Sequence, residues 1–304
     1  MTPTEFVYSS HDRCEHIHRD WLVQRALESG HNKTILYLPF SSGARADQEY
    51  SWGTFSWYFD RFRDYGLLPR TFLYEDNLRR EDVEAFFDWL RTSQVAILGG
   101  GSTAIGMERY RALGGRYFGN PDAFAQTLRA RQADGLLTVG FSAGAAQLCE
   151  HGCDSAETPV FGMIAKVVVT LHHEPAARGH LQHLARKHPD CLIFGLPNDS
   201  GIAVSRGFSG RNNYWQLIQF VTDSSWDKPG DDFHIKTRQG INVEHRYADG
   251  REWNFNGGDV LLRVFYQGGG WEAWIKRPEA PVFHEYGSQR ECGYRSVEEI
   301  LSSR

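Results

Sequence analysis

Short apolar runs alternate with longer amphipathic stretches along the first two-thirds of this 304-residue chain. Apolar runs of strand length occupy residues 6–8, 34–39, 71–74, 94–98, 136–141, 166–171 and 191–196. Apolar side chains at helical spacing occupy residues 20–27, 55–65, 80–91, 122–133, 143–149 and 178–187. Such alternation is typical of βαβ units. We therefore predict an α/β fold with an open, mostly parallel sheet, in which ligands bind beyond the carboxyl ends of the strands.

The pattern changes after about residue 206. Gly, Asn, Asp and Trp become frequent, and strand-like runs at 233–236, 260–266 and 271–275 are separated by turns. Five of the nine tryptophans lie in this segment, which is too short to bury them by itself. We predict an α/β domain over residues 1–206 and a β-rich extension over residues 207–304 that packs on it.

Composition narrows the class of protein. A hydrophobic fraction of 41% and a charged fraction of 23% fit a globular chain. The net charge of −5, with no basic stripe, argues against nucleic acid as a partner. No apolar run approaches the roughly 20 residues of a membrane span, and no signal peptide is visible. The five cysteines lack the spacing of a disulfide scaffold, so we expect a cytoplasmic protein without a membrane partner.

The sequence Gly-Phe-Ser-Ala-Gly at residues 140–144 fits Gly-x-Ser-x-Gly between a predicted strand and a predicted helix. That context is required for a nucleophile elbow, a tight turn that exposes the serine in a strained conformation. The next amide, from Ala143, can then help to bind an oxyanion. The alternative is an ordinary turn with a capping serine. We predict that Ser142 is the nucleophile of a hydrolase.

The sequence Gly-Gly-Gly-Ser-Thr at residues 99–103 follows the preceding predicted strand. Consecutive glycines let the backbone present its N–H groups at close range. A phosphate-binding loop would need lysine where Met107 follows Gly106. We therefore predict that this loop supplies the other half of an oxyanion hole, with a glycine-rich turn that binds nothing as the alternative.

A serine nucleophile needs a base, and the base needs an orienting group. His172 and His173 end a predicted strand, so one of them faces the active edge of the sheet, and the pattern leaves open which. Glu157 and Asp199 are the candidate orienting carboxylates, and spacing does not choose between them. Arg178 is a candidate for binding a substrate carboxylate, unless it is a solvated charge at the start of a helix.

Two groups of residues invite a metal interpretation. Residues 149–153 read Cys-Glu-His-Gly-Cys, but this is not the spacing of a zinc-binding pair. His180, His183 and His188 lie on or beside a predicted helix, with Glu174 as the only nearby carboxylate in sequence. We expect no metal and no cofactor.

Residues 1 to about 205 resemble the peptidase E and cyanophycinase family of serine peptidases, whose core is similar to the class I glutamine amidotransferase domain. The matching segments, in family order, are residues 38–40, 95–103, 138–145, 167–173 and 195–199. The resemblance implies a three-layer, flavodoxin-like α/β fold. It also implies Ser142 as nucleophile and an oxyanion hole formed by Gly100 or Gly101 with Ala143.

The family also has a histidine two residues after a β-branched strand, which falls on His172, or on His173 with a shift of one. Its carboxylate, followed by one residue and a proline, corresponds to Glu157 in Glu-Thr-Pro. Its later Asp-Glu pair is Asp199-Ser200 here, and the Asn that usually follows the glycines is Ser102.

We predict a serine peptidase or amidase that hydrolyses a peptide-like amide bond through an acyl-enzyme, for example a dipeptidase or isopeptidase acting on acidic substrates. Its partner would be a peptide or amino-acid-derived small substrate. A second copy of the chain, in a homodimer, is a further possible partner. Amidotransferases carry cysteine at the elbow, so Ser142 argues against glutamine hydrolysis. One rival interpretation is a non-catalytic small-molecule or peptide-binding protein that keeps the fold. Another is an esterase of the α/β-hydrolase type, with His245 or His284 as its late histidine.

Overall fold

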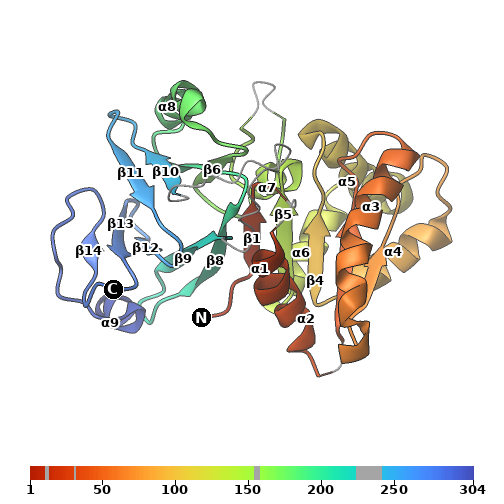
Figure 1. Cartoon of the computed structure of the whole chain (residues 1–304), viewed down its shortest axis with the longest axis horizontal. Helices are drawn as coiled ribbons and strands as arrows, with labels where there is room; N and C mark the ends of the chain where they lie inside the picture. Colours follow the sequence, from red (N-terminus) through yellow and green to blue (C-terminus); the bar gives the residue numbers. More distant parts are fainter. Residues whose placement is uncertain (11–13, 31, 154–157, 224–241) are drawn as a thin grey trace, which may run out of the picture.

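The computed structural model describes residues 1–10, 14–30, 32–153, 158–223 and 242–304. A 10-stranded sheet has the strand order β14-β13-β12-β9-β8-β1-β5-β4-β2-β3, and a 4-stranded sheet has the order β11-β10-β7-β6 (Figure 1). The chain is therefore an α/β protein, as the alternation of strands and helices predicts. The main sheet is mixed, because parallel strands form one half of it and antiparallel strands the other.

The parallel half is the part of the main sheet that begins at β1. Its strands are β1 (Glu5–Tyr8), β5 (Leu137–Phe141), β4 (Val95–Leu98), β2 (Thr34–Leu38) and β3 (Leu68–Thr71). Successive side chains of a strand point to opposite faces, and both faces of β2 are buried. Ile35 and Tyr37 belong to one apolar cluster, whereas Leu36 and Leu38 belong to another. Burial on both faces explains the uninterrupted apolar runs in the sequence.

Helices cover both faces of the parallel half (Figure 1). One face carries α1 (Glu15–Ile17), the π-helical turn η1 (His18–Val23), α2 (Gln24–Leu27), α3 (Arg45–Phe59) and the 3₁₀ turn η2 (Asp60–Tyr65). The other face carries α4 (Arg80–Thr92), α5 (Thr103–Phe118), α6 (Ala123–Ala133) and α7 (Ala143–Leu148).

The antiparallel half continues the same sheet beyond β1. Its strands are β8 (Ser200–Phe208), β9 (Tyr214–Thr222), β12 (Val260–Phe265), β13 (Trp271–Lys276) and β14 (His284–Glu285). The helix α9 (Val297–Ser303) begins after Ser296, whose hydroxyl accepts a hydrogen bond from the amide of Glu299. Ile300 of α9 packs with Trp215 and Trp274 of these strands. Tryptophans after residue 206 thus contribute to a small apolar cluster of their own.

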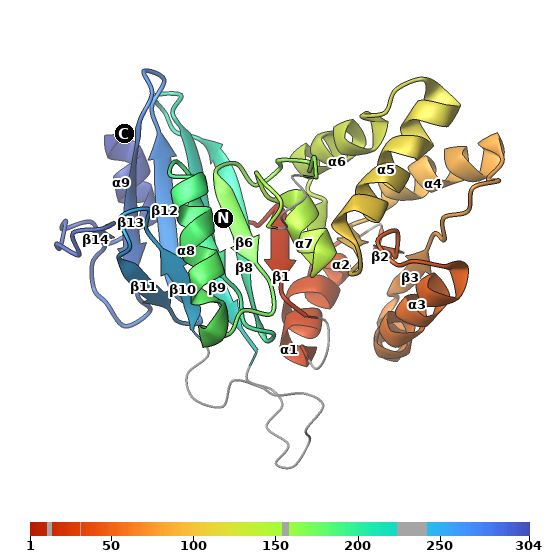
Figure 2. The ribbon, with the colours of Figure 1, turned by 90° about the horizontal axis from the view of Figure 1, so that it is seen from above.

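The second sheet is stacked on the antiparallel half (Figure 2). It contains β6 (Val167–Thr170), β7 (Leu192–Gly195), β10 (Val243–Arg246) and β11 (Glu252–Phe255). The ring of Phe255 stacks on that of Phe220 in β9, with centroids 3.9 Å apart. On the outer side, α8 (Arg178–Lys187) covers β6 and β7. We call the antiparallel half together with this second sheet the two-sheet region.

Arg263 joins the two sheets from β12. Its side chain is fully buried, and one guanidinium nitrogen donates to the carbonyl oxygens of Ala165 and Lys166 and to the amide oxygen of Gln216. Burial lowers the pKa of this arginine to about 10. Since the first two acceptors immediately precede β6, the arginine ties the start of the second sheet to the main sheet.

Several elements differ from the sequence-based expectation. β6 and β7 belong to the second sheet instead of a single parallel sheet. Sequence analysis missed α5, in which glycines interrupt the apolar stripe. It also predicted a helix from Phe55, whereas α3 begins at Arg45; aromatic residues on both faces of α3 obscure its helical pattern. β8 and β9 were also missed. The predicted strand at 233–236 lies outside the described residues.

Candidate active site

Ser142 occupies a sharp turn between β5 and α7. Its backbone angles are φ 49° and ψ −121°, a combination that residues with a side chain rarely adopt. A Cβ atom on Gly140 would lie 2.3 Å from the carbonyl oxygen of Gly144, and one on Gly144 would lie 2.1 Å from that of Leu98. Both glycines of the motif are therefore required for α7 to start directly against β4 and β5. This close packing holds the serine in its strained conformation.

His172 approaches the serine from the second sheet. Its Nε2 lies 3.4 Å from Ser142 Oγ. The histidine follows β6 and has a left-handed φ of 53°, and its amide donates to Ser9 Oγ at 2.6 Å. The side chain of His172 is exposed, whereas that of His173 is buried. Of the two adjacent histidines, His172 is the one that meets the serine.

Asn198 contacts the other side of the His172 ring. The distance from His172 Nδ1 to Asn198 Oδ1 is 2.6 Å. An amide oxygen can only accept a hydrogen bond, so Nδ1 carries the hydrogen and the lone pair of Nε2 faces Ser142. This tautomer allows the imidazole to accept the proton of a serine hydroxyl.

The two carboxylates singled out from the sequence are Asp199 and Glu157. Asp199 is buried beside Asn198, and its carbonyl oxygen accepts a hydrogen bond from the amide of Asp223. Glu157 lies outside the described residues. The sequence-based prediction named carboxylates only and did not include Asn198, which lies in the segment Gly-Leu-Pro-Asn-Asp at 195–199. The sequence signal that could have identified it is a polar side chain shortly after β7, at the same edge of the sheet as His172 after β6.

The glycine loop after β4 lies against the elbow. A Cβ atom on Gly100 would be 3.2 Å from Ser142 Cβ and 2.9 Å from the ring of Phe141. Within the described ranges, no hydrogen bond engages the amides of Gly100, Gly101 and Ala143. Backbone amides of this kind can bind a developing oxyanion if they point toward the reacting carbonyl.

Ser102 directly precedes α5. Its hydroxyl accepts a hydrogen bond from the amide of Ile105 at 3.4 Å, as an N-terminal cap of the helix. The side chain at this position therefore has a local structural role.

Arg178 is paired within the chain. Its Nε donates to a carboxylate oxygen of Glu244 at 3.0 Å, and the same oxygen lies 3.1 Å from Nε2 of His173. The Arg178 side chain is 51% exposed, so solvent still reaches it. The residue expected to bind a substrate carboxylate thus already contacts one from β10.

The late histidines of the esterase interpretation lie in the two-sheet region. His245 is buried, with Nδ1 bonded to the carbonyl oxygen of Ile193 and Nε2 to the hydroxyl of Tyr286, and burial lowers its pKa to about 4. His284 belongs to β14, an edge strand, where it lies 4.0 Å from Glu291. Neither position brings an imidazole to the elbow.

Two further findings concern metals and membranes. Among the described residues, no cluster of three or more His, Cys, Asp and Glu side chains could hold a metal ion. His180, for example, bonds through Nε2 to the carbonyl oxygen of Cys153. None of the helices in the described ranges is long and apolar enough to cross a membrane.

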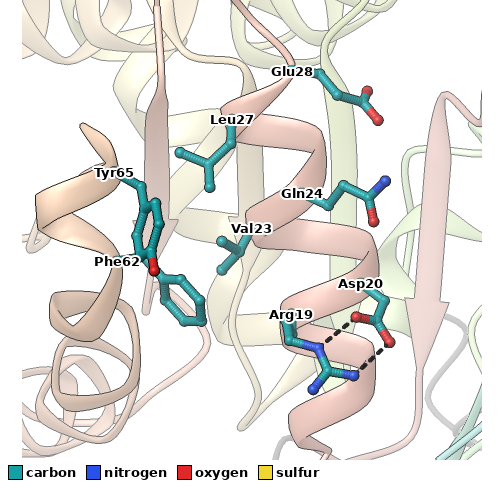
Figure 3. Close-up of a pocket in the computed structure, with 8 residues that line it drawn as sticks. All are labelled: Arg19, Asp20, Val23, Gln24, Leu27, Glu28, Phe62 and Tyr65. Atoms are coloured by element: carbon teal, nitrogen blue, oxygen red, sulfur yellow. Dashed lines mark hydrogen bonds and ion pairs between the residues drawn. The ribbon is translucent and has the colours of Figure 1, made fainter.

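A pocket of about 540 Å³ lies between the η1–α2 segment and η2, on the face of the parallel half that these elements cover. Figure 3 shows Val23 and Leu27 facing Phe62 and Tyr65 across it, with an ion pair between Arg19 and Asp20 at its rim. None of the eight residues drawn is a serine, cysteine or histidine. None of Ser142, His172 and Asn198 lines it, so this pocket is not part of the candidate site.

Comparisons with known proteins give a likeness of fold. No family model matches the sequence, and no curated protein matches it significantly. The crystal structure of a peptidase from an acI-B1 Actinobacterium is similar, with a TM-score of 0.57 and 15% identity over 86% of this chain and 96% of that one. A KaiC-like protein from Pyrococcus horikoshii OT3 reaches a TM-score of only 0.30 at 8% identity over 83% of this chain and 89% of that one. This score is too low to indicate a common fold. The chain thus shares its fold with a solved peptidase.

Proposed function

We propose that this chain is a serine peptidase or amidase, related to the peptidase E and cyanophycinase family and built on a three-layer, amidotransferase-like core. The observation that carries the proposal is the distance of 3.4 Å between Ser142 Oγ and His172 Nε2. The strained elbow at Ser142 and the fold shared with a peptidase support it. The substrate would be a peptide or an amino-acid-derived amide.

In the first half of the reaction, Ser142 Oγ attacks the carbonyl carbon of the amide while its proton moves to His172 Nε2. The new C–O bond makes a tetrahedral intermediate, whose oxyanion would be bound by amides of the Gly100 loop and of Ala143. The intermediate collapses as the C–N bond breaks, and His172 gives its proton to the leaving amine. An acyl-enzyme and a free amine result.

Water completes the reaction along the same route. His172 Nε2 takes a proton from water, whose oxygen attacks the acyl carbon, and then returns that proton to Ser142 Oγ as the ester bond breaks. Throughout, Asn198 Oδ1 accepts the hydrogen of Nδ1 and so holds the imidazole in the required orientation. A neutral amide orients the ring without the charge that a carboxylate would offer to the imidazolium.

Covalent labelling tests the proposal. A fluorophosphonate should modify the folded wild-type chain at one serine, and peptide mapping should identify that residue as Ser142. Heat-denatured protein is the matched control, because a serine activated by its environment loses reactivity on unfolding. Ser142→Ala should abolish both labelling and amide hydrolysis, with a loss of turnover of about 10⁶-fold.

A non-catalytic binding protein is the second candidate, and the neutral Asn198 in place of a carboxylate is the observation that favours it. This candidate expects a wild-type chain that is not labelled, together with a Ser142→Ala variant whose ligand affinity is unchanged. Labelling at Ser142 would exclude it.

A further inference from the structure

Glu244 is a buried carboxylate close to the candidate base. It lies in β10, directly opposite Gly195 of β7, and is only 5% exposed. One carboxylate oxygen contacts His173 Nε2 at 3.1 Å and Arg178 Nε at 3.0 Å. The other accepts from Arg246, at 2.7 Å from Nε and 2.6 Å from a terminal nitrogen. Four N–H donors therefore converge on two oxygens.

These donors keep the carboxylate charged. Burial raises the pKa of Glu244, but the hydrogen bonds from His173, Arg178 and Arg246 together outweigh it and hold that pKa below its ordinary value. The charged carboxylate in turn attracts the ring N–H of His173, which makes this hydrogen bond stronger than one between neutral groups.

His173 is held from three directions. Its ring N–H donates to Glu244, and its backbone N–H donates to the carbonyl oxygen of Leu196 at 2.9 Å. A Cβ atom on Gly195 would lie 2.5 Å from Cγ of the ring, so the imidazole packs flat on a residue without a side chain. The position of His173 is thus determined by β7 and β10 together.

The adjacent residue is His172, whose left-handed backbone is a conformation that persists only where the surroundings hold it. Ser9 holds its amide on one side, and His173 holds the chain on the other. We propose that Glu244, through its contact with His173, is a positioning residue for His172 and thereby for the reaction at Ser142. The carboxylate comes from the sequence after residue 206, so this part of the chain has a direct role in aligning the base. The inference rests on the proposed hydrolase function.

Glu244→Gln tests the inference, with Glu252→Gln as the matched control. Glu252 contacts only the outer side of the same network, through Arg246 at 2.7 Å, and is 51% exposed. In Glu244→Gln, one oxygen and one amide group replace two oxygens, so the four donors cannot all be satisfied. We expect kcat to fall by about 10- to 100-fold, as for a misplaced catalytic group, with KM within about two-fold. Glu252→Gln should match the wild type.

Fluorophosphonate kinetics separate misalignment from partial unfolding. For Glu244→Gln the labelling rate should fall by the same factor as kcat, while the final stoichiometry stays at one label per chain. A labelling rate equal to that of the wild type would overturn the inference and leave the proposed function intact. A wild-type chain that is not labelled at Ser142 would overturn the proposed function, and the inference with it.

Two variants at His173 give a second measurement if Glu244→Gln proves unstable. His173→Gln retains an N–H group that can reach Glu244, whereas His173→Leu has none. We expect the glutamine variant to keep most of the wild-type kcat and the leucine variant to lose about as much as Glu244→Gln. Equal activity of both variants at the wild-type level would also overturn the inference.

Discussion

The parallel half of the main sheet and the two-sheet region bury their strands in different ways. In the parallel half, β1, β2, β4 and β5 are buried on both faces between layers of helices. In the two-sheet region, strands pack face to face, and β11 leaves alternate residues exposed. One continuous sheet therefore serves two architectures, and the change occurs between β1 and β8.

The candidate site lies where the two architectures meet. The parallel half carries Ser142 and the glycine loop, whereas the two-sheet region carries His172 and Asn198 after β6 and β7. Each region is expected to supply a different chemical role: the nucleophile and oxyanion amides from one, the base and its orientation from the other. Variants that affect one region at a time test this division.

Removal of the sequence after residue 206 should have the largest effect. The 1–206 fragment ends inside β8 and lacks β9, the neighbour of β8, as well as β10, which pairs with β7. We expect an insoluble chain, or one without a cooperative thermal transition, as measured by size-exclusion chromatography and circular dichroism. A soluble, active fragment with the melting temperature of the full chain would contradict this division of roles.

His172→Ala should lower turnover by about 10⁴-fold or more, because the serine then has no base. The control is His183→Ala, which removes an exposed histidine of α8 and should leave turnover unchanged. Amide hydrolysis and the melting temperature should be measured for both variants. Comparable turnover in the two would mean that the two-sheet region does not supply the base.

Changes at Asn198 should have an intermediate effect. Asn198→Ala removes one hydrogen bond to the imidazole, worth about 1 to 3 kcal/mol, so we expect kcat to fall by about 5- to 150-fold. Asn198→Asp retains an acceptor and adds charge, so its kcat should equal or exceed that of the wild type. If both variants are equally impaired, orientation of His172 does not depend on an acceptor at this position.

The smallest expected effect is on folding stability, and it comes from Glu5 at the amino end of β1, the end away from the candidate site. Glu5 is fully buried and lies 2.7 Å from Arg206 of β8, and burial raises its pKa to about 7 despite the arginine. Between pH 4.5 and 7 the folded chain therefore keeps a proton that the unfolded chain releases, and folding stability falls as pH rises. Glu5→Gln should remove this decline.

Thermal melts at several pH values check the Glu5 prediction. The melting temperature of Glu5→Gln should exceed that of the wild type by a few °C at pH 8, with the difference shrinking toward pH 4.5. Activity should be unchanged, because Glu5 is at the amino end of β1 and the elbow is at the carboxyl end of β5, which runs parallel to it. A pH-independent difference would show that Glu5 does not titrate in this range.

Much of the fold could be predicted because the pattern of apolar residues along the sequence indicates which faces of a strand or helix are buried. The strands 34–39, 94–98 and 136–141 are apolar on both faces, and these runs correspond to β2, β4 and β5. β6 and β7 have the same local pattern, yet they form another sheet, since a buried strand does not encode which sheet it joins. That choice depends on partners such as β10, far along the chain.

In the candidate site, too, residues with a local requirement could be predicted, whereas residues that depend on distant strands could not. Ser142 and the glycine loop could be proposed because their local conformations demand particular residues. Asn198 and Glu244 could not, since their contacts to His172 and His173 arise only when separate strands are brought together. Neither position carries a conformational requirement of its own that a sequence pattern would reveal.

The late position of β10 in the chain has a consequence for biosynthesis. A ribosome exposes the elbow well before it has made Glu244, so the nascent polypeptide carries the proposed nucleophile before it has the residue proposed to position the base. The growing chain should therefore remain catalytically latent until β10 has been made and has paired with β7, and should acquire hydrolytic activity only then. Ribosome-bound chains stalled just after β8 should resist fluorophosphonate, whereas completed, released chains should react, and equal reactivity of the two would refute this latency.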